Sequence, residues 1–129
     1  MFPKYFTLKE ANQLLPLIKP IVADILKKGK EAAKTLSEYD TPHGAKMAKR
    51  MFDDVEGLTA KLEAMGCFYK DWNFEIGLVD FPSIIEGEEV FLCWRSDEGE
   101  ILWYHSMEGG FAGRRPLPAE WLLGDLFKS

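Results

Sequence analysis

The sequence predicts an α+β domain in which an N-terminal antiparallel helical hairpin packs on a small antiparallel β-sheet, followed by a short C-terminal helix. Two observations lead to this prediction. Residues 8–65 repeat apolar side chains at three- and four-residue spacing, which is the period of an amphipathic helix. Residues 67–105 are rich in β-branched and aromatic side chains, and turns that contain glycine divide them into segments typical of strands.

The first helix is expected to begin at Thr7. Thr7-Leu8-Lys9-Glu10 has the capping-box pattern, in which the threonine hydroxyl and the glutamate carboxylate accept hydrogen bonds from amides at the start of a helix. The apolar stripe that follows comprises Leu8, Ala11, Leu15, Ile18, Val22, Ile25, Gly29, Ala32, Leu36 and Tyr39. Pro16 and Pro20 lie off this stripe, but each removes a backbone donor, so we expect a kink or a break between residues 12 and 20.

A second helix is expected after a turn at residues 40–43. Its apolar stripe comprises Ala48, Met51, Val55, Leu58, Leu62 and Met65, and Gly66 occupies the place of the left-handed residue that ends a helix. Two helices joined by a short loop pack antiparallel, and each covers the stripe of the other. Phe52 and Leu26 lie beside the stripes, so the β-half of the chain or a second copy of the protein must cover this face. Gly29, Ala32 and Ala33 would let another helix approach closely, although small residues in such a stripe more often serve only the contact within the chain.

The strands are expected at residues 67–69, 74–81, 83–85, 90–95 and 101–105, with Pro82 closing the second of them and a turn at residues 86–89. Asp97-Glu98-Gly99 has the pattern of a three-residue hairpin loop with Gly99 in the left-handed conformation. That loop would pair Arg95 with Ile101, Cys93 with Trp103, and Phe91 with His105.

Residues paired in this way share one face of the sheet. One face would carry Phe91, Cys93, Arg95, Ile101, Trp103 and His105, and the other would carry Val90, Leu92, Trp94, Leu102 and Tyr104. The second set is apolar or aromatic, so we expect it to pack on the helices.

We expect residues 118–124 to form a short capped helix that docks Trp121 and Leu122 on the rest of the domain. The chain, residues 1–129, is then one domain in three parts. These parts are the helical hairpin at 1–66, the β-sheet at 67–106, and the glycine-rich loop with the C-terminal segment at 107–129.

Composition places the chain among ordinary globular proteins, with 47% hydrophobic and 29% charged residues. No apolar run approaches the ~20 residues of a membrane span, and the N-terminal residues lack the order of a signal peptide, so we expect a cytoplasmic protein without membrane contact. Cys67 and Cys93 have neither disulfide-framework nor zinc-ribbon spacing.

The net charge of -5 is unevenly distributed, because basic groups concentrate between residues 27 and 50. Clustered Lys and Arg can neutralise phosphates, so contact with nucleic acid or the ribosome through this basic end is one alternative. Charges on the outer face of helices are usually solvated, and we therefore expect no nucleic-acid partner.

The stretch WYHSMEGGFAGRRP, residues 103–116, holds most of the candidate binding residues. Glycines allow backbone amides to approach a ligand closely and to bind an anion, and arginine presents a planar fork to carboxylate or phosphate. We expect an anion-sized pocket at the end of the sheet, formed by Arg95, His105, Gly110, Gly113 and Arg114. Alternatively, Arg114 pairs with Asp80 or Glu108 and only holds the loop to the sheet.

Acid–base chemistry is a second possibility at the same place. Asp80 lies between apolar residues and needs a partner if it is buried. Beside His105 it would suit a small hydrolase or isomerase that acts on an anionic substrate. Cys93 lies on the same face as His105, so its thiol is a candidate nucleophile. Free cysteines are, however, commonly small residues of the core. His105 and Glu108 lack further ligands at a supporting spacing, so we expect neither a metal site nor a cofactor.

The strings FTLKEANQLLPLIKP, YKDWNFEIGLVDFPS, GEEVFLCWR and WYHSMEGGFAGRRPL resemble the bacterial family catalogued as domain of unknown function 2203 (DUF2203). The resemblance covers nearly the whole chain. It implies a small stand-alone bacterial protein and carries over no catalytic residue. We therefore expect a non-enzymatic binding or interaction module that binds a small anion and self-associates through its helices, for example as a homodimer, with the hydrolase or isomerase as the alternative.

Overall fold

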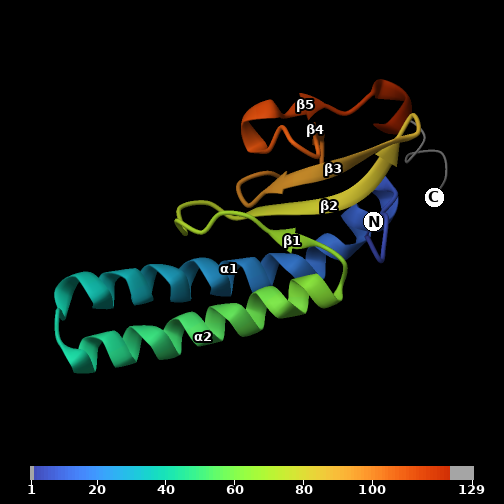
Figure 1. Ribbon diagram of the computed structural model, residues 1–129. Helices are drawn as coiled ribbons and strands as arrows, with labels where there is room; N and C mark the ends of the chain where they lie inside the picture. Colours follow the sequence, from blue (N-terminus) through green and yellow to red (C-terminus); the bar gives the residue numbers. More distant parts are fainter. Residues whose placement is uncertain (1, 123–129) are drawn as a thin grey trace.

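The computed structural model, which describes residues 2–122, has a helical layer and a sheet layer (Figure 1). The antiparallel helices are α1 (Leu8–Glu38) and α2 (Pro42–Ala64). The antiparallel strands, in the order in which they lie across the sheet, are β1 (Phe68–Tyr69), β2 (Leu78–Ile85), β3 (Glu88–Arg95), β4 (Trp103–Ser106) and β5 (Arg115–Pro116). This arrangement confirms the predicted α+β class.

Two short helical segments complete the described chain. The 3-10 helix η1 (Phe111–Gly113) lies between β4 and β5, and residues 119–122 are helical. The last two residues of the helix expected at 118–124 lie outside the described residues. Within residues 2–122, neither long helix is apolar enough over a sufficient length to cross a membrane.

The start of α1 has the predicted capping box. The Thr7 hydroxyl accepts a hydrogen bond from the Glu10 amide at 3.1 Å, and the Glu10 carboxylate accepts one from the Thr7 amide at 2.9 Å. Pro16 and Pro20 lie inside one uninterrupted helix, so a break between residues 12 and 20 was the wrong expectation. Both prolines are exposed, where water can bond to the carbonyl groups that lose their amide partners.

The end of α2 also follows the prediction. Gly66 has a φ of +96°, its amide donates to the Glu63 carbonyl at 2.9 Å, and the Cys67 amide donates to the Leu62 carbonyl at 3.1 Å. These two bonds form a Schellman motif, which satisfies carbonyls that the helix leaves unpaired. The chain turns there into β1.

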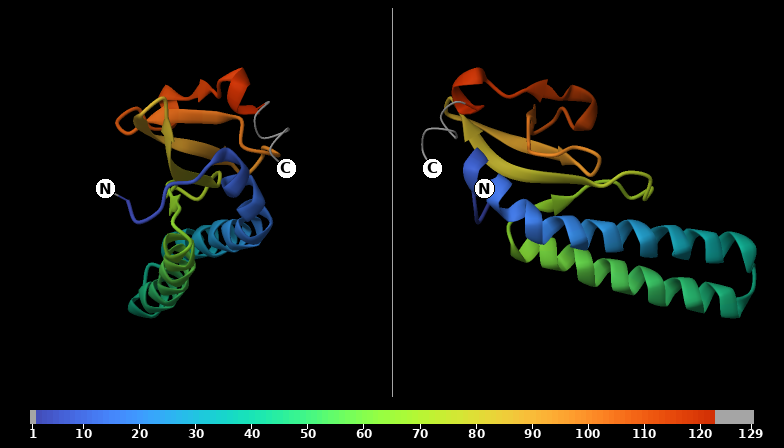
Figure 2. Two further views of the ribbon diagram at one scale, coloured as in Figure 1. Left: turned by 90° about the vertical axis from the view of Figure 1, so that its right-hand side faces the viewer. Right: turned by 180° about the vertical axis from the view of Figure 1, so that it is seen from behind.

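The apolar stripe of α1 is buried from Leu8 to Ala32, but its last two members, Leu36 and Tyr39, are exposed. The buried position near this end is Thr35, whose hydroxyl donates to the Glu31 carbonyl. The half of the hairpin near the α1–α2 turn extends beyond the sheet, as Figures 1 and 2 show, so no strand covers it.

The strand predicted to begin at residue 74 begins at Leu78, because residues 71–77 form a loop organised by Asp71. The Asp71 carboxylate accepts hydrogen bonds from the amides of residues 73, 75 and 76 at 2.7 to 3.1 Å. The loop directs Phe74 onto α1, where a β-carbon at Gly29 would lie 2.2 Å from the ring. Gly29 therefore makes room for an aromatic side chain and not for another helix.

Strand β2 runs through Pro82 to Ile85, so the expectation that Pro82 ends a strand was wrong. β1 is too short to reach Pro82, and the Phe6 amide donates to the Pro82 carbonyl at 2.7 Å on that side. The following turn is shorter than the predicted 86–89. Glu86 and Gly87 alone connect β2 to β3, both with positive φ, which is the pattern of a type I′ hairpin turn.

The predicted pairing of β3 with β4 is confirmed where both strands are regular: Cys93 faces Trp103 and Phe91 faces His105. The connection between them is longer than the three-residue loop, and Gly99 is not left-handed. Ile101 therefore does not pair with Arg95. The Asn12 side chain accepts a hydrogen bond from the Ile101 amide at 2.8 Å, and this places Ile101 in the core and Leu102 at the surface, the reverse of the expectation.

The contact between Phe74 and Gly29 yields a stability prediction. Gly29→Ala should lower the free energy of unfolding by about 1–3 kcal/mol, because the methyl group overpacks a buried ring. The matched control is Gly57→Ala on α2, where the β-carbon meets nothing within 4 Å. The control should gain up to ~1 kcal/mol from helix propensity. Urea unfolding measures both, and a stabilising Gly29→Ala would contradict the described packing.

Candidate functional site

The face of the sheet turned away from the helices contains a buried polar cluster. Asp80 on β2 lies opposite Cys93 on β3, and Cys93 lies opposite Trp103 on β4, two residues before His105. Side chains at these positions share one face because the side chains of a strand alternate. Asp80, Cys93 and His105 are only 4%, 1% and 3% exposed. The register of the three strands therefore brings together a carboxylate, a thiol and an imidazole that lie far apart in the sequence.

Asp80 and His105 form a hydrogen-bonded pair across β3. His105 Nε2 lies 3.0 Å from Asp80 Oδ1, and His105 Nδ1 lies 2.7 Å from the Ser106 carbonyl oxygen. A carbonyl only accepts, so Nδ1 carries a proton, and a further proton is shared between Nε2 and the carboxylate. Burial acts to lower the pKa of His105, but the bond and charge of Asp80 outweigh burial, and the pKa is raised.

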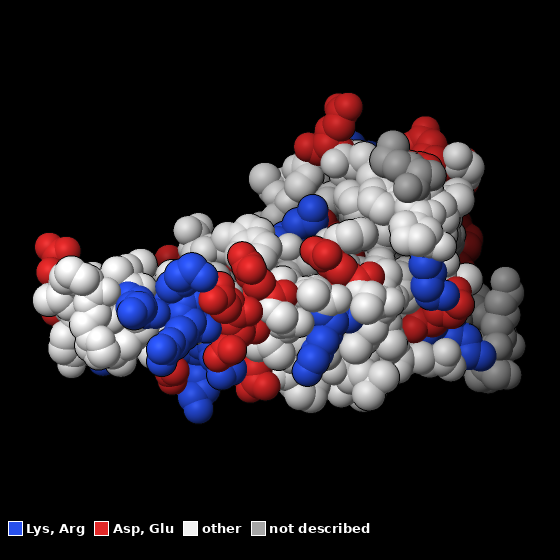
Figure 3. All heavy atoms as spheres, turned by 60° about the horizontal axis from the view of Figure 1, so that its bottom comes forward, with Lys and Arg blue, Asp and Glu red and all other residues white. Residues whose placement is uncertain are grey.

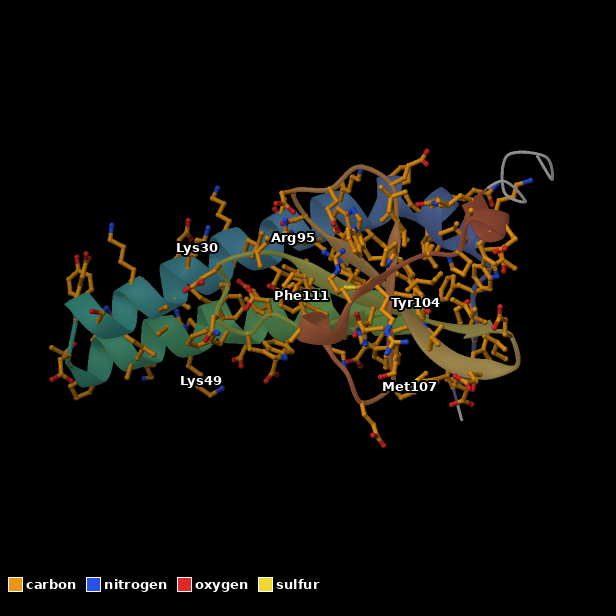
Figure 4. The ribbon with its side chains drawn as sticks, turned by 90° about the horizontal axis from the view of Figure 1, so that it is seen from above. Lys30, Lys49, Arg95, Tyr104, Met107 and Phe111 are labelled. Carbon is orange, nitrogen blue, oxygen red and sulfur yellow. The ribbon has the colours of Figure 1, made fainter. Side chains whose placement is uncertain are left out.

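A hollow of about 240 Å³ opens over this pair. It is lined by Lys70, Leu78, Asp80, Phe91, Cys93, His105, Met107, Glu108, Gly110 and Phe111. The strands supply its floor, and the loop after β4 supplies a wall. Figure 4 shows Met107 and Phe111 on this loop, seen from the side of the sheet opposite the helices.

Of the predicted binding residues, His105 and Gly110 line the hollow. Gly110 has a φ of +59° and a ψ of -167°, a conformation essentially restricted to glycine, so the turn into η1 depends on it. Other amides of the loop bond within it: Gly109 donates to the Ser106 hydroxyl at 2.9 Å, and Gly113 donates to the Gly110 carbonyl at 3.1 Å. These two amides therefore shape the loop and do not face a ligand.

Arg95 and Arg114 lie outside the lining of the hollow and hold the loop in place. Arg95 pairs with Asp97 at 2.5 Å, and Arg114 pairs with Glu98 at 2.6 Å. Both guanidinium groups lie close to the ring of Phe111: that of Arg95 is 5.7 Å from the ring centre, and that of Arg114 is 4.9 Å from it. Figure 4 labels Arg95 and Phe111. The partner of Arg114 is thus Glu98 and neither of the two acids expected from the sequence.

Lys70, which sequence reasoning missed, is the exposed cation that lines the hollow. Its ammonium group lies 5.5 Å from the centre of the Phe91 ring and 6.0 Å from that of Phe68. Within residues 2–122 no carboxylate forms an ion pair with it. The sequence held one signal: Lys70 is one of only three basic residues between positions 53 and 100.

The thiol groups of Cys67 and Cys93 are both buried. Burial raises the pKa of Cys67 and of Cys93 to about 12. Both are therefore thiols near neutral pH, and a thiolate nucleophile at Cys93 is disfavoured unless another group displaces its proton.

The basic part of the hairpin carries its own counter-charges. Lys28 pairs with Asp54 at 3.6 Å, Lys34 with Glu38 at 3.9 Å, and Lys49 with Asp53 at 3.1 Å. In Figure 3, blue (Lys, Arg) and red (Asp, Glu) groups lie side by side on the face that is turned forward. The face in this view is a mixed surface and not a continuous basic one.

The chain matches the family described as uncharacterized conserved protein (DUF2203) over residues 4–117. It belongs to the DUF2203 family. This confirms the resemblance seen in the sequence, and the matched range includes both long helices, all five strands and every residue that lines the hollow. No curated protein and no solved structure matches the chain.

The two arginines should differ in their effect on stability. The side chain of Arg114 is 11% exposed and its Nε atom is buried without a partner, whereas Arg95 and Asp97 are 33% and 55% exposed. Arg114→Ala leaves Glu98 partly buried without its cation and should cost about 2–4 kcal/mol. Arg95→Ala should cost under ~1 kcal/mol. Equal losses in urea unfolding would contradict this assignment.

Proposed function

We propose that this protein is a binding module whose hollow over the Asp80–His105 pair takes a small ligand with an anionic group. The observation that carries the proposal is the ammonium of Lys70, which lines the hollow and has no carboxylate partner within the described chain. An unpaired cation over aromatic rings, beside a concave surface, is a site where an anion gains a charge-assisted contact without breaking an existing ion pair.

The size and lining of the hollow limit the ligand. About 240 Å³ is below the volume of most pockets that bind drug-sized molecules, which begin near ~300 Å³. Leu78, Phe91, Met107 and Phe111 supply apolar walls. A phosphate or carboxylate that carries a short organic group therefore fits better than a nucleotide.

The two acidic residues that line the hollow limit which chemical groups the ligand can carry. The charge of Asp80 is balanced by the proton that it shares with His105, so it does not oppose an anion. Glu108 is exposed and adds a negative charge to the lining. A ligand that also carries a hydrogen-bond donor, such as a hydroxyl or ammonium group, would use Glu108 as an acceptor.

Thermal unfolding in the presence of inorganic phosphate and short-chain carboxylates tests the proposal. An anion at ~100 times its dissociation constant should stabilise the protein by about 2.7 kcal/mol and raise Tm by roughly 3–8 °C. Lys70→Met should remove this shift. Lys30→Met, which removes an exposed lysine on α1, should keep it. The proposal fails if no anion raises Tm, or if the shift persists in Lys70→Met.

Self-association through the helices is part of the same proposal, with a second copy of the chain as the partner. Leu36 and Tyr39 are 46% and 57% exposed on the part of the hairpin that the sheet does not cover. Leu36→Glu should shift sedimentation toward monomer. Leu17→Glu, at a position 61% exposed on the same helix, should not. A wild-type protein that sediments as a monomer at every concentration would end this part of the proposal.

A further inference from the structure

Asp80, Cys93 and His105 together have the composition of a metal site. A carboxylate oxygen, the sulfur and a ring nitrogen of these three residues all lie within 4.8 Å of one another. We propose that they bind one divalent transition-metal ion of the zinc type at the floor of the hollow. The inference rests on the proposed function and deepens it, because the metal would be the cation that an anionic ligand meets there.

The orientation of His105 supports ligation by Nε2. Its Nδ1–H donates to the Ser106 carbonyl at 2.7 Å, and this fixes the ring so that Nε2 points at Asp80. Histidines that ligate metals almost always donate their other ring N–H to a carbonyl or carboxylate, which selects the tautomer and orients the ring. This supporting bond is already present.

The charge of the buried site is the same with and without the metal. In the described structure a neutral thiol at Cys93 lies beside a pair in which Asp80 and His105 share one proton, and the sum is zero. A divalent ion displaces the thiol proton and the shared proton, so two protons leave. It then balances one thiolate and one carboxylate beside a neutral imidazole, and the sum is again zero. No uncompensated charge is buried in either state, which removes the largest cost of forming such a site.

The distances fit a metal of this class after a small adjustment. Zinc lies ~2.0–2.3 Å from N, O and S ligands, which places tetrahedral ligands roughly 3.5 Å apart. His105 Nε2 and Asp80 Oδ1 are 3.0 Å apart, and the widest separation in the cluster is at most 4.8 Å. Side-chain rotations of about 1 Å would close the difference. Sulfur and imidazole donors favour zinc over magnesium or calcium, which prefer oxygen.

The hollow leaves one coordination position open. Three side chains come from three adjacent strands below, and the space above them is the hollow itself. Three protein ligands with a vacant fourth position are the arrangement of zinc sites that bind water or substrate, whereas structural sites use four protein ligands. A phosphate or carboxylate oxygen could take that position while Lys70 contacts the rest of the anion.

The test begins with full-length protein freed of metal by a chelator and then titrated with Zn²⁺ by calorimetry and with Co²⁺ by absorption spectroscopy. We expect one ion per chain, a rise in Tm, and a thiolate-to-cobalt charge-transfer band. Cys93→Ser should abolish the band and weaken Zn²⁺ binding by about 100-fold or more, since even supporting groups around a metal contribute 10- to 100-fold. Cys67→Ser, the other buried cysteine, should keep both.

Two results would overturn the inference. The first is wild-type protein that binds no stoichiometric Zn²⁺ and shows no cobalt–thiolate band, a measurement that needs no variant to fold. The second is stoichiometric binding that survives Cys93→Ser unchanged.

Titration of inorganic phosphate and acetate into chelator-treated and Zn²⁺-loaded protein separates this inference from the proposed function. Zn²⁺ binding without any effect of either anion keeps the metal site and removes the anion-binding function. Anion binding to protein that takes up no Zn²⁺ keeps the anion-binding function and removes the metal site. Tighter anion binding to the Zn²⁺-loaded form supports both.

Discussion

The pairing register of β2, β3 and β4 is the constraint on which the site and the core both depend. It places Asp80, Cys93 and His105 on one face and the apolar side chains that meet the helices on the other. A slip of one residue would exchange the two faces, because side chains alternate along a strand. The polar side chains would then pack against α1, and the apolar side chains would be exposed to solvent. The tight turn at Glu86 and Gly87 helps to prevent this slip by fixing the β2–β3 pairing.

The Asp80–His105 bond reinforces this register from the opposite face. It spans β3 and joins β2 to β4 through side chains that are almost fully buried. Such a pair gives little net stability over an apolar replacement, but it is strongly destabilising to break. Its value to the fold therefore lies in specificity, because a shifted register would leave both groups without partners. The same bond links two of the strands that form the floor of the hollow.

Sequence reasoning succeeded where local patterns decide the structure. Helix period, the Thr7 cap, the Gly66 terminator and the alternation along β3 and β4 all depend on neighbours in the chain. It failed at residues 71–77, where the Asp71 side chain organises a loop in place of the expected strand, and also where a distant residue redirects the backbone. Asn12 captures the Ile101 amide and reverses the expected faces there, and no local pattern at residues 96–102 indicates this. Of the candidate site, the shared face of Cys93 and His105 was predictable from the pairing of β3 with β4. The position of Asp80 opposite Cys93, and with it the bond to His105, also needs the register of β2.

The arginines and the lysine near the hollow have different surroundings. Arginine was expected to bind the anion because its planar guanidinium suits anions. In the structure, the guanidinium of Arg114 pairs with Glu98 and lies over the ring of Phe111. These contacts hold a glycine-containing loop against the sheet and fix the position of the Arg114 side chain. Lys70 follows β1 at the sheet edge, its ammonium held over aromatic rings, where no carboxylate of the described chain reaches it. The structure thus distinguishes two arginines that contact Phe111 and nearby carboxylates from a lysine that lines the hollow itself.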